Sequence, residues 1–226
     1  MEQLNRLELL IGSENLNKIA DKTVLVAGLG GVGSYAVESL VRSGIKKIIL
    51  VDYDIIDITN LNRQLMTDHT NIGQKKIDVL KKRVEKINPF IEIKCYDLFL
   101  NKENIKLVFK EKIDYVIDSL DTIETKKLLI KECVSNDIKI ISCMGVGNKM
   151  DPTRLKIADI RKTSYDKIAK ILRKMIKDEG INVNIPVVYS EEESVKTGEV
   201  IGSNSFVPAI AGLLCSSYVI NDIIKK

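Results

Sequence analysis

Residues 24–54 read VLVAGLGGVGSYAVESLVRSGIKKIILVDYD and decide the fold of the chain. An apolar run breaks into glycines, restarts as a helix, and is followed by a second apolar run that ends in Asp52. Gly28 permits a tight turn, Gly30 lets a ligand approach the backbone, and Gly33 lets the helix pack closely on the strand. This pattern is typical of a nucleotide site, with a helix N-terminus facing phosphate and an acid facing ribose. The alternative is a βα turn that merely packs well.

The rest of the chain continues this alternation of strands and helices. We predict an α/β fold with a Rossmann-like, mainly parallel sheet flanked by helices and extended by antiparallel strands, in one domain over residues 1–226. Residues 4–21 are predicted to form short helices that break at Gly12. The predicted strands are Thr23–Ala27, Lys47–Val51, Ile91–Tyr96, Tyr115–Ile117, Lys139–Ser142, Arg154–Ile160 and Pro186–Tyr189. The predicted helices are Val32–Arg42, Gly73–Asn88, Lys102–Lys110, Ile123–Ser135, Asp166–Asp178 and Val207–Ile224.

The composition limits the class of protein. The 226 residues carry a formal net charge of +4, so any site for a polyanion must be local. The four cysteines are well separated, no CxxC is present, and His69 is the single histidine, which argues against structural zinc and histidine catalysis. We expect a reduced, cytoplasmic compartment, since the N-terminus shows no signal-peptide pattern. Because the apolar run Val207–Ile224 contains Pro208 and Asp222, we interpret it as a buried helix rather than a membrane span.

Polar and charged residues gather in the segments that follow the predicted strands. Residues 53–71 are too polar for a core and too long for a turn, and such loops carry the sites of α/β proteins. NAD needs little more than the glycine turn and one acid, whereas a triphosphate split between its α and β phosphorus atoms needs cations and a divalent metal. Arg63 and Lys76 are the candidate cations, and Asp121 is the candidate metal ligand. Each of them, taken alone, could be a solvated surface residue.

Several short motifs, in this order and spacing, resemble the adenylating domain of the ubiquitin-activating and sulfur-carrier-activating enzymes. They are Gly28-Leu-Gly-Gly-Val-Gly33, Asp52-Tyr-Asp54, Asn60-Leu-Asn-Arg63-Gln64, Gly73-Gln-Lys-Lys76, Ile87-Asn-Pro89 and Asp118-Ser-Leu-Asp121. Within that superfamily the chain is similar, over nearly its whole length, to the tRNA threonylcarbamoyladenosine dehydratases. The motifs of this second resemblance are Leu9-Leu-Ile-Gly12, Met144-Gly-Val-Gly-Asn-Lys149, Asp151-Pro-Thr153, Ile157-Ala-Asp159, Lys162-Thr163-Ser164 and Ser205-Phe-Val-Pro208.

The resemblance implies a reaction and a set of site residues. ATP would activate the carboxylate of a threonylcarbamoyl group on an adenosine of tRNA, and the activated group would cyclise. ATP and Mg²⁺ would be the cofactors, in a homodimer. The residues implied in nucleotide binding are Gly28, Gly30, Gly31 and Gly33 for the phosphates, Asp52 for the ribose, Asn60, Arg63 and Lys76 for the polyphosphate, and Asp54 in the same site. The residues implied in catalysis are Arg63, Lys76, Asp121 as the magnesium ligand, and Arg6, which would reach into the partner's site.

Two departures from the wider superfamily favour the dehydratase interpretation. Sulfur-carrier relatives commonly have two CxxC pairs, and thioester-forming members carry a cysteine in a loop beyond the sheet; this chain has no CxxC and no cysteine in the loop Ser190–Ser203. A cyclising dehydratase needs no thioester, because its nucleophile is already tethered to the substrate. Cys143 follows a predicted strand, where a free cysteine is commonly a small core residue, and a catalytic role is the alternative.

Other functions stay open at this stage. One is a sulfur-carrier-protein adenylyltransferase, with a sulfur-transfer or carrier protein as partner, and another is a non-catalytic nucleotide-binding scaffold. An NAD dehydrogenase is disfavoured, because neither a catalytic histidine nor a Tyr-x-x-x-Lys hydride-site pattern is found.

A basic stripe is predicted on the helix Asp166–Asp178. Lys167, Lys170, Lys174 and Lys177 repeat at intervals of three and four, opposite an apolar face. A solvated amphipathic face has this pattern, and so does a surface that contacts the tRNA backbone. Both interpretations stay open.

Overall fold

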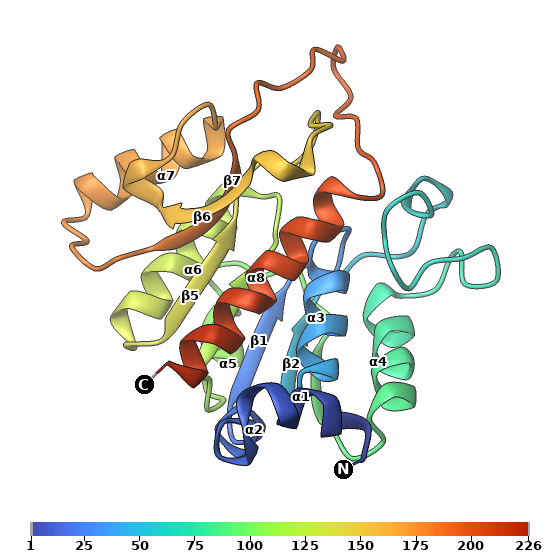
Figure 1. The fold of residues 1–226 in the computed structure, drawn as a ribbon. Coiled ribbons are helices and arrows are strands. Elements are labelled where there is room, and N and C mark those ends of the chain that lie inside the picture. Colours follow the sequence, from blue (N-terminus) through green and yellow to red (C-terminus); the bar gives the residue numbers. More distant parts are fainter. Residues whose placement is uncertain (1, 226) are drawn as a thin grey trace.

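A computed structural model describes residues 2–225 and contains one seven-stranded sheet with the order β3-β2-β1-β4-β5-β7-β6. The strands are β1 (Thr23–Ala27), β2 (Lys47–Val51), β3 (Glu92–Tyr96), β4 (Tyr115–Asp118), β5 (Lys139–Cys143), β6 (Leu155–Asp159) and β7 (Pro186–Ser190). The α-helices are α1 (Asn5–Ile11), α2 (Ser13–Ala20), α3 (Gly33–Arg42), α4 (Lys76–Ile87), α5 (Ile105–Val108), α6 (Ile123–Ser135), α7 (Lys167–Asp178) and α8 (Val207–Ile224). Figure 1 shows how they surround the sheet.

The central strands are apolar throughout because helices cover both faces of the sheet. In β1, Val24 and Val26 point into one core with residues of α2, α3, α4 and α8, while Leu25 and Ala27 point into the other with residues of α5, α6 and α7. All of them are fully buried, as expected for a parallel strand between two helical layers. The prediction of a mainly parallel sheet flanked by helices is confirmed.

At the edge of the sheet, the predicted antiparallel extension is the pair of strands β6 and β7. β7 runs parallel to β5, and only β6 runs antiparallel, to β7. The chain leaves β5 through a loop that contains the short 3₁₀ helix Pro152–Arg154 but no α-helix, and it then runs back as β6. After β6, the chain crosses back along the sheet through α7, so β7 runs in the same direction as β5.

Two predicted helices begin later or are shorter than expected. The helix predicted from Gly73 begins at Lys76, since Gly73 has a left-handed φ of 84° and its amide bonds the carbonyl of Ile56. The helix predicted over residues 102–110 is reduced to α5, because the Asn101 side chain accepts the amides of Glu103 and Asn104 in a local turn.

α8 packs along α3 on one face of the sheet, as predicted for a buried helix. Within residues 2–225, it alone has the length and apolar composition of a membrane span, and half of it is buried in the protein. A Cβ on Gly212 would lie 2.2 Å from the carbonyl oxygen of Val32, so the two helices are in backbone contact there. α8 therefore holds the start of α3, which follows the glycine loop.

Candidate active site

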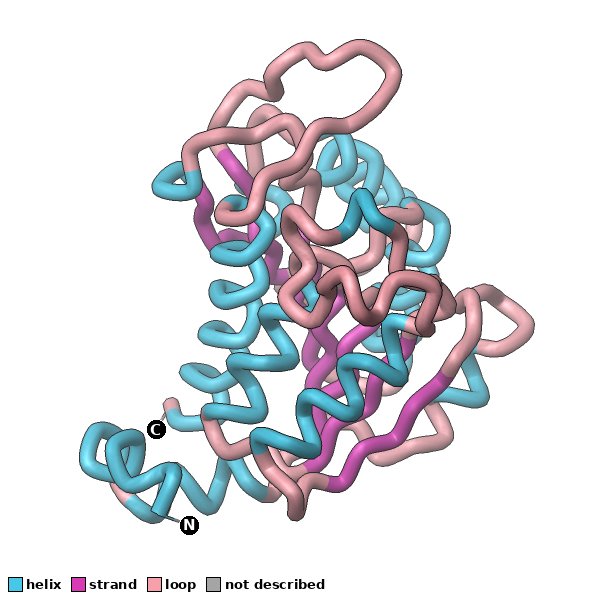
Figure 2. Tube along the Cα trace, turned by 90° about the vertical axis from the view of Figure 1, so that its right-hand side faces the viewer, coloured by secondary structure: helices cyan, strands magenta, loops and turns pink. Residues whose placement is uncertain are grey.

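A cavity of about 500 Å³ opens at the carboxyl ends of the parallel strands, where loops gather at one end of the molecule (Figure 2). It lies where β1 and β4 are neighbours and the strand order reverses, the usual ligand position in such sheets. The predicted residues that line it are Gly28, Gly30, Gly31, Asp52, Asp54, Asn60, Arg63, Lys76 and Asp121. Gly33 lies behind this surface, and Arg6 lies elsewhere on α1.

The glycine loop is shaped by contacts that exclude side chains. Gly28 has a φ of 85°, and a Cβ there would lie 2.8 Å from the carbonyl oxygen of Ser119. A Cβ on Gly33 would lie only 1.8 Å from the carbonyl oxygen of Gly28. In the described chain the amides of Gly30 and Gly31 donate to no protein acceptor, and both residues line the cavity. The loop can therefore donate these amides to an anion at the N-terminus of α3.

Asp52 fixes the end of β2 against the glycine loop. One carboxylate oxygen accepts the amide of Leu29 at 2.6 Å and the other accepts the amide of Asp54 at 2.8 Å. Burial raises the pKa of Asp52, and the two amide donors act in the opposite direction. A buried carboxylate held by two amides has a fixed orientation at the cavity wall.

Lys76 is the first residue of α4, and its buried side chain lies beside the cavity. Its Nζ is 2.6 Å from Oδ2 of Asp54, and its amide donates to the carbonyl oxygen of Asp54 at 3.0 Å. The loop before α4 therefore binds the segment after β2 through both backbone and side chain. This double contact places an ammonium group at the rim, within reach of a bound anion.

The segment from Asn60 to Gln64 forms another wall. The Asn60 side chain accepts the amide of Asp57 in a capping box, which fixes the short helix Ile58–Asn60. Nη1 of Arg63 donates to the carbonyl oxygen of Thr59 at 2.8 Å, and no acidic residue pairs with this guanidinium among the ion pairs of residues 2–225. The remaining guanidinium donors are thus available to a ligand.

Gln64 is a site residue that the sequence analysis did not select. It is 5% exposed, it lines the cavity, and its Oε1 is buried without a hydrogen-bond partner in the described chain. An unpaired buried acceptor costs free energy unless a ligand or water satisfies it. Its position next to Arg63 in the Asn60–Gln64 motif was the available signal.

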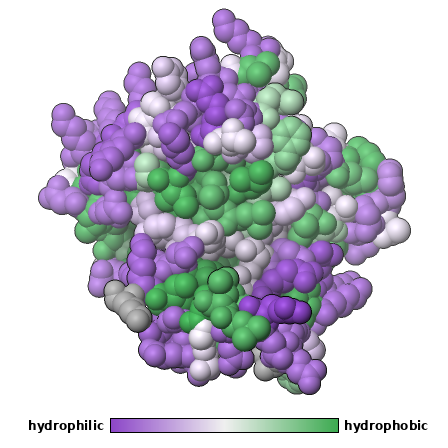
Figure 3. All heavy atoms as spheres, in the orientation of Figure 1, coloured by the Kyte–Doolittle hydropathy of each residue, from purple (hydrophilic) through white to green (hydrophobic). Residues whose placement is uncertain are grey.

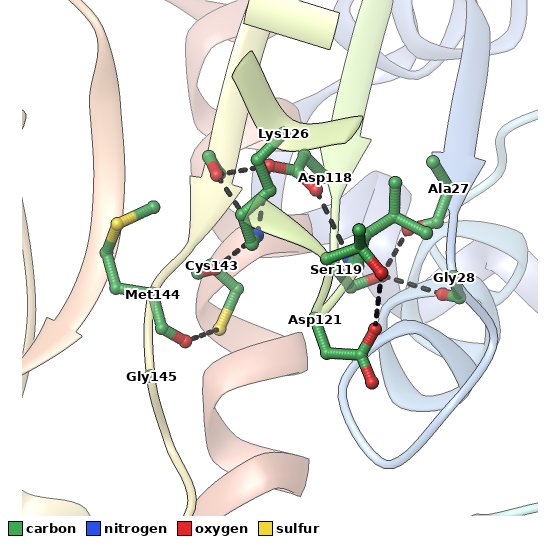
Figure 4. Close-up of polar contacts among 12 residues, drawn as sticks. Ala27, Gly28, Asp118, Ser119, Asp121, Lys126, Cys143, Met144 and Gly145 are labelled. Atoms are coloured by element: carbon green, nitrogen blue, oxygen red, sulfur yellow. Dashed lines mark hydrogen bonds and ion pairs between the residues drawn. The ribbon is translucent and has the colours of Figure 1, made fainter. Parts of the chain in front are cut away.

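Lys126 is a second missed residue, and Figure 4 shows it between Asp118 and the backbone of Cys143. Its ammonium group is fully buried and donates to Oδ2 of Asp118 at 3.0 Å and to the carbonyl oxygen of Cys143 at 2.7 Å. The hydroxyl of Ser142 donates to the same carboxylate. This network ties the end of β4 to the end of β5. A lysine on the apolar side of the helix Ile123–Ser135 was the signal in the sequence.

Asp121 extends from the loop after β4 into the cavity and is exposed. Its one hydrogen bond from a side chain comes from Thr122 Oγ1 at 3.3 Å, so its carboxylate keeps acceptor capacity. Within residues 2–225, no group of three or more His, Cys, Asp or Glu residues could enclose a metal ion. A metal here would need most of its ligands from a bound phosphate and water.

Cys143 packs between the core and the cavity. The residue is 3% exposed, and its thiol donates to the carbonyl oxygen of Met144 at 3.5 Å. It neighbours Cys215, whose thiol pKa is raised well above its ordinary value by the contact with Cys143 and by burial. All four cysteines are free. Both thiols have the surroundings of core residues.

Arg6 is not brought to the cavity of its own chain. It is exposed on α1, beside the start of the parallel strands, whereas the cavity lies at their carboxyl ends (Figure 1). It can reach a site of this kind only on another copy of the chain.

The fold and the cavity define a nucleotide-binding α/β protein in which free backbone amides and cationic side chains meet at the switch point of a parallel sheet. The chain belongs to the ThiF family, whose family model matches residues 2–226. This confirms the family resemblance seen in the sequence.

Relatives and solved structures refine this assignment. The chain is 42% identical to the tRNA threonylcarbamoyladenosine dehydratase of Bacillus subtilis, with 100% of this chain and 96% of that protein covered. The protein of the same name from Haemophilus influenzae is 35% identical, with 94% and 90% covered. The crystal structure of the Escherichia coli tRNA N6-threonylcarbamoyladenosine dehydratase, TcdA, in complex with ATP superposes with a TM-score of 0.93 at 32% identity, covering 99% of this chain and 94% of that one.

Proposed function

We propose that this protein is an ATP-dependent tRNA threonylcarbamoyladenosine dehydratase formed by one adenylating domain over residues 1–226, acting in the cytoplasm. The observation that carries the proposal is a cavity lined by free glycine amides, Arg63 and Lys76 in a chain that matches dehydratases over its whole length. Arg63, Lys76 and the glycine amides suit a polyphosphate. A dinucleotide site would not need the two cationic side chains.

ATP would lie with its phosphates over the glycine loop. The amides of Gly30 and Gly31 would bind phosphate oxygens at the N-terminus of α3, and the carboxylate of Asp52 would accept a ribose hydroxyl. Asn60, Arg63 and Lys76 would line the β- and γ-phosphates, with Asp54 holding Lys76 in place. Gln64 Oε1 would gain its missing donor from the nucleotide or from a water bound beside it.

The residues present also fit a magnesium ion that arrives with ATP. Mg²⁺ is usually bound by one or two carboxylates plus phosphates and water, and Asp121 offers one carboxylate with free acceptor capacity at the cavity. When bound, the ion would neutralise charge on the phosphates. Asp121 would hold it through the rigid end of β4.

The chemistry divides into an activation and a cyclisation. The substrate carboxylate attacks the α-phosphorus of ATP, a new P–O bond forms, and the bond to pyrophosphate breaks. Arg63 and Lys76 stabilise the charge that collects on pyrophosphate. A nucleophile within the same threonylcarbamoyl group then attacks the acyl carbon and AMP leaves, so one water is lost overall. No protein thiol takes part, since Cys143 is buried and the loop Ser190–Ser203 has no cysteine.

A homodimer would supply Arg6 in trans. The neighbours of Arg6 on α1 include Leu9, 83% exposed, and Leu10, 81% exposed, and the outer face of α8 exposes Leu213. Figure 3 shows apolar residues gathered over α8 in the middle of this face and again over the N-terminal helices below it. Apolar surface of this extent is typical of an interface.

Mixing two inactive variants tests the dimer. If Arg6 acts across it, a mixture of Arg6→Ala and Arg63→Ala chains regains about a quarter of wild-type turnover, because half of the dimers are mixed and each has one intact site. A mixture as inactive as its components would exclude Arg6 from the partner's site.

The decisive experiment is mass spectrometry of nucleosides from threonylcarbamoylated tRNA after incubation with protein and ATP. We expect loss of one water from the modified adenosine, with AMP and pyrophosphate released. Lys76→Met should abolish the change, whereas Lys75→Met should not, because Lys75 is exposed, pairs with Asp97 and lies outside the cavity. AMP release that depends on a carrier protein ending in Gly-Gly would point instead to sulfur-carrier activation. A protein that binds NAD but not ATP would instead support the alternative function of an NAD dehydrogenase.

A further inference from the structure

The basic stripe of α7 is an exposed cationic surface without ion-pair partners among residues 2–225. Lys167, Lys170, Lys174 and Lys177 are all exposed, and none of them takes part in an ion pair with an acid of residues 2–225. The charges of Arg161 and Lys131, in contrast, are compensated by Asp159 and Glu179. The stripe covers about 15 Å at 1.5 Å per residue, a length that spans about four phosphates of one strand.

The opposite side of α7 belongs to the core. Ala169, Leu172, Met175 and Ile176 are buried in the apolar layer beneath the sheet. A helix that lies on a membrane must insert its apolar face into lipid, and here that face is occupied. An anionic polymer that needs only the cationic face is the partner that fits.

The first turn of α7 touches the wall of the ATP cavity. One carboxylate oxygen of Asp166 caps the helix by accepting the amide of Ala169 at 2.8 Å, and the other accepts the amide of Gly145 at 2.9 Å. Gly145 and Ile168 both line the cavity. The stripe thus begins at the cavity wall and runs away from it along the edge of the molecule (Figure 1).

Tyr165 stands at the cavity end of the stripe. It is 71% exposed and has a φ of 52°, a left-handed conformation that bulky residues rarely adopt. Such strain persists where the surroundings enforce it, often at binding sites. An exposed ring beside a row of cations is the combination that binds unpaired nucleotides, through stacking and phosphate contacts.

We propose that Tyr165 and the lysine stripe of α7 form the RNA-docking surface of this protein. The stripe binds the phosphate backbone of the anticodon arm, and Tyr165 stacks on an unpaired base next to the one that enters the cavity. This assignment rests on the proposed function, because it takes the substrate to be tRNA.

The test compares two pairs of lysines with the same spacing. Lys170→Gln with Lys174→Gln removes two charges from the stripe. Lys82→Gln with Lys86→Gln removes two exposed, unpaired charges from α4, at the opposite edge of the sheet. Binding of fluorescent tRNA transcript to the full-length chain is measured from 50 to 200 mM salt, and ATP binding is measured by calorimetry.

The stripe variant should bind tRNA about tenfold more weakly, and its slope of log affinity against log salt should be shallower by about 1.4 to 1.8. The α4 variant should match the wild type, and all three proteins should bind ATP equally. Equal effects of the two double substitutions would overturn the proposal and leave the proposed function intact. Absence of tRNA binding by the wild type would overturn both.

Tyr165→Asn tests the stacking contact without disturbing the backbone, since asparagine tolerates a positive φ. It should weaken tRNA binding by roughly five- to a hundredfold while the salt slope stays unchanged. Wild-type affinity in this variant would remove Tyr165 from the surface. Binding to vesicles of anionic lipid that is lost in the stripe variant, with tRNA binding retained, would assign the stripe to a membrane and refute the RNA assignment.

Discussion

Replacing Gly33 with alanine tests how the glycine loop is held. The added Cβ would lie 1.8 Å from the carbonyl oxygen of Gly28 and 2.6 Å from Oγ of Ser119. Real Cβ atoms essentially never approach other atoms within 3.0 Å, so the distance to Gly28 must grow from 1.8 to at least 3.0 Å, a shift of about 1.2 Å. The obstacle is backbone, which cannot rotate away as a side chain would.

The size of the effect follows from this shift. Overpacking of a tight contact costs about 1–3 kcal/mol, and in a chain of this size each kcal/mol lowers the melting temperature by about 2–4 °C. A loop displaced by about 1 Å would no longer place its amides on the phosphates that we propose it binds, which would cost about a hundredfold in turnover. We therefore expect Gly33→Ala to melt roughly 2–12 °C lower and to lose ATP-dependent activity by about two orders of magnitude.

Thermal unfolding and the release of AMP measure the two effects separately. Gly30→Ala is the matched control for stability, because its Cβ would meet only Nε2 of Gln64, at an ordinary 3.8 Å. It should melt like the wild type. A Gly33→Ala protein with wild-type melting temperature and wild-type turnover would refute the loop geometry on which the site is built.

Four other substitutions probe the rest of the site and its support. Arg63→Ala and Asp121→Asn should both stay folded and lose turnover by about a hundred- to a thousandfold, and a titration with Mg²⁺ should partly rescue only Asp121→Asn. Cys143→Ser should keep substantial dehydration of the modified adenosine, as judged by mass spectrometry, and a hundredfold loss in folded protein would indicate covalent catalysis. Burial, together with the hydrogen bond to Asp222, raises the pKa of Tyr115 to about 12. Because this pKa is above the ordinary value for tyrosine, the contribution of the Tyr115 hydroxyl to the free energy of unfolding is complete below pH 10. That contribution is lost as the pH rises through 12. Tyr115→Phe should therefore flatten the fall in unfolding free energy between pH 10 and 12, as measured by denaturant titration.

The sequence predicted those parts of the fold that depend on local pattern. The glycine loop, the alternation of strands and helices, and the polar residues after strand ends all follow from short-range rules. Because parallel strands bring their carboxyl ends to one edge, Asp121 could be placed in one cavity with Asp52 and Arg63 although it is far from both in sequence. Their roles stay predictions.

The parts that could not be predicted depend on contacts between distant segments. Lys126 lies on the apolar side of its helix, but its partners are known only once β4 and β5 place Asp118 and a carbonyl oxygen around it. Gln64 Oε1 lacks a partner only because the fold encloses it. The direction of β7 depends on where α7 returns the chain, and periodicity carries no information about that.

The buried Lys126 network also relates the two halves of the proposed activity. By bonding both Asp118 and the carbonyl oxygen of Cys143, Lys126 fixes the loop that carries Asp121 relative to the wall that continues to Gly145. Gly145 in turn donates to Asp166 at the start of α7. The nucleotide side of the cavity and the surface proposed for RNA are therefore joined by a few hydrogen bonds and the short backbone segment from Cys143 to Gly145. In such an arrangement, tRNA docked on α7 would present its adenosine at a fixed distance from the α-phosphate, which is the positioning that carboxylate attack requires.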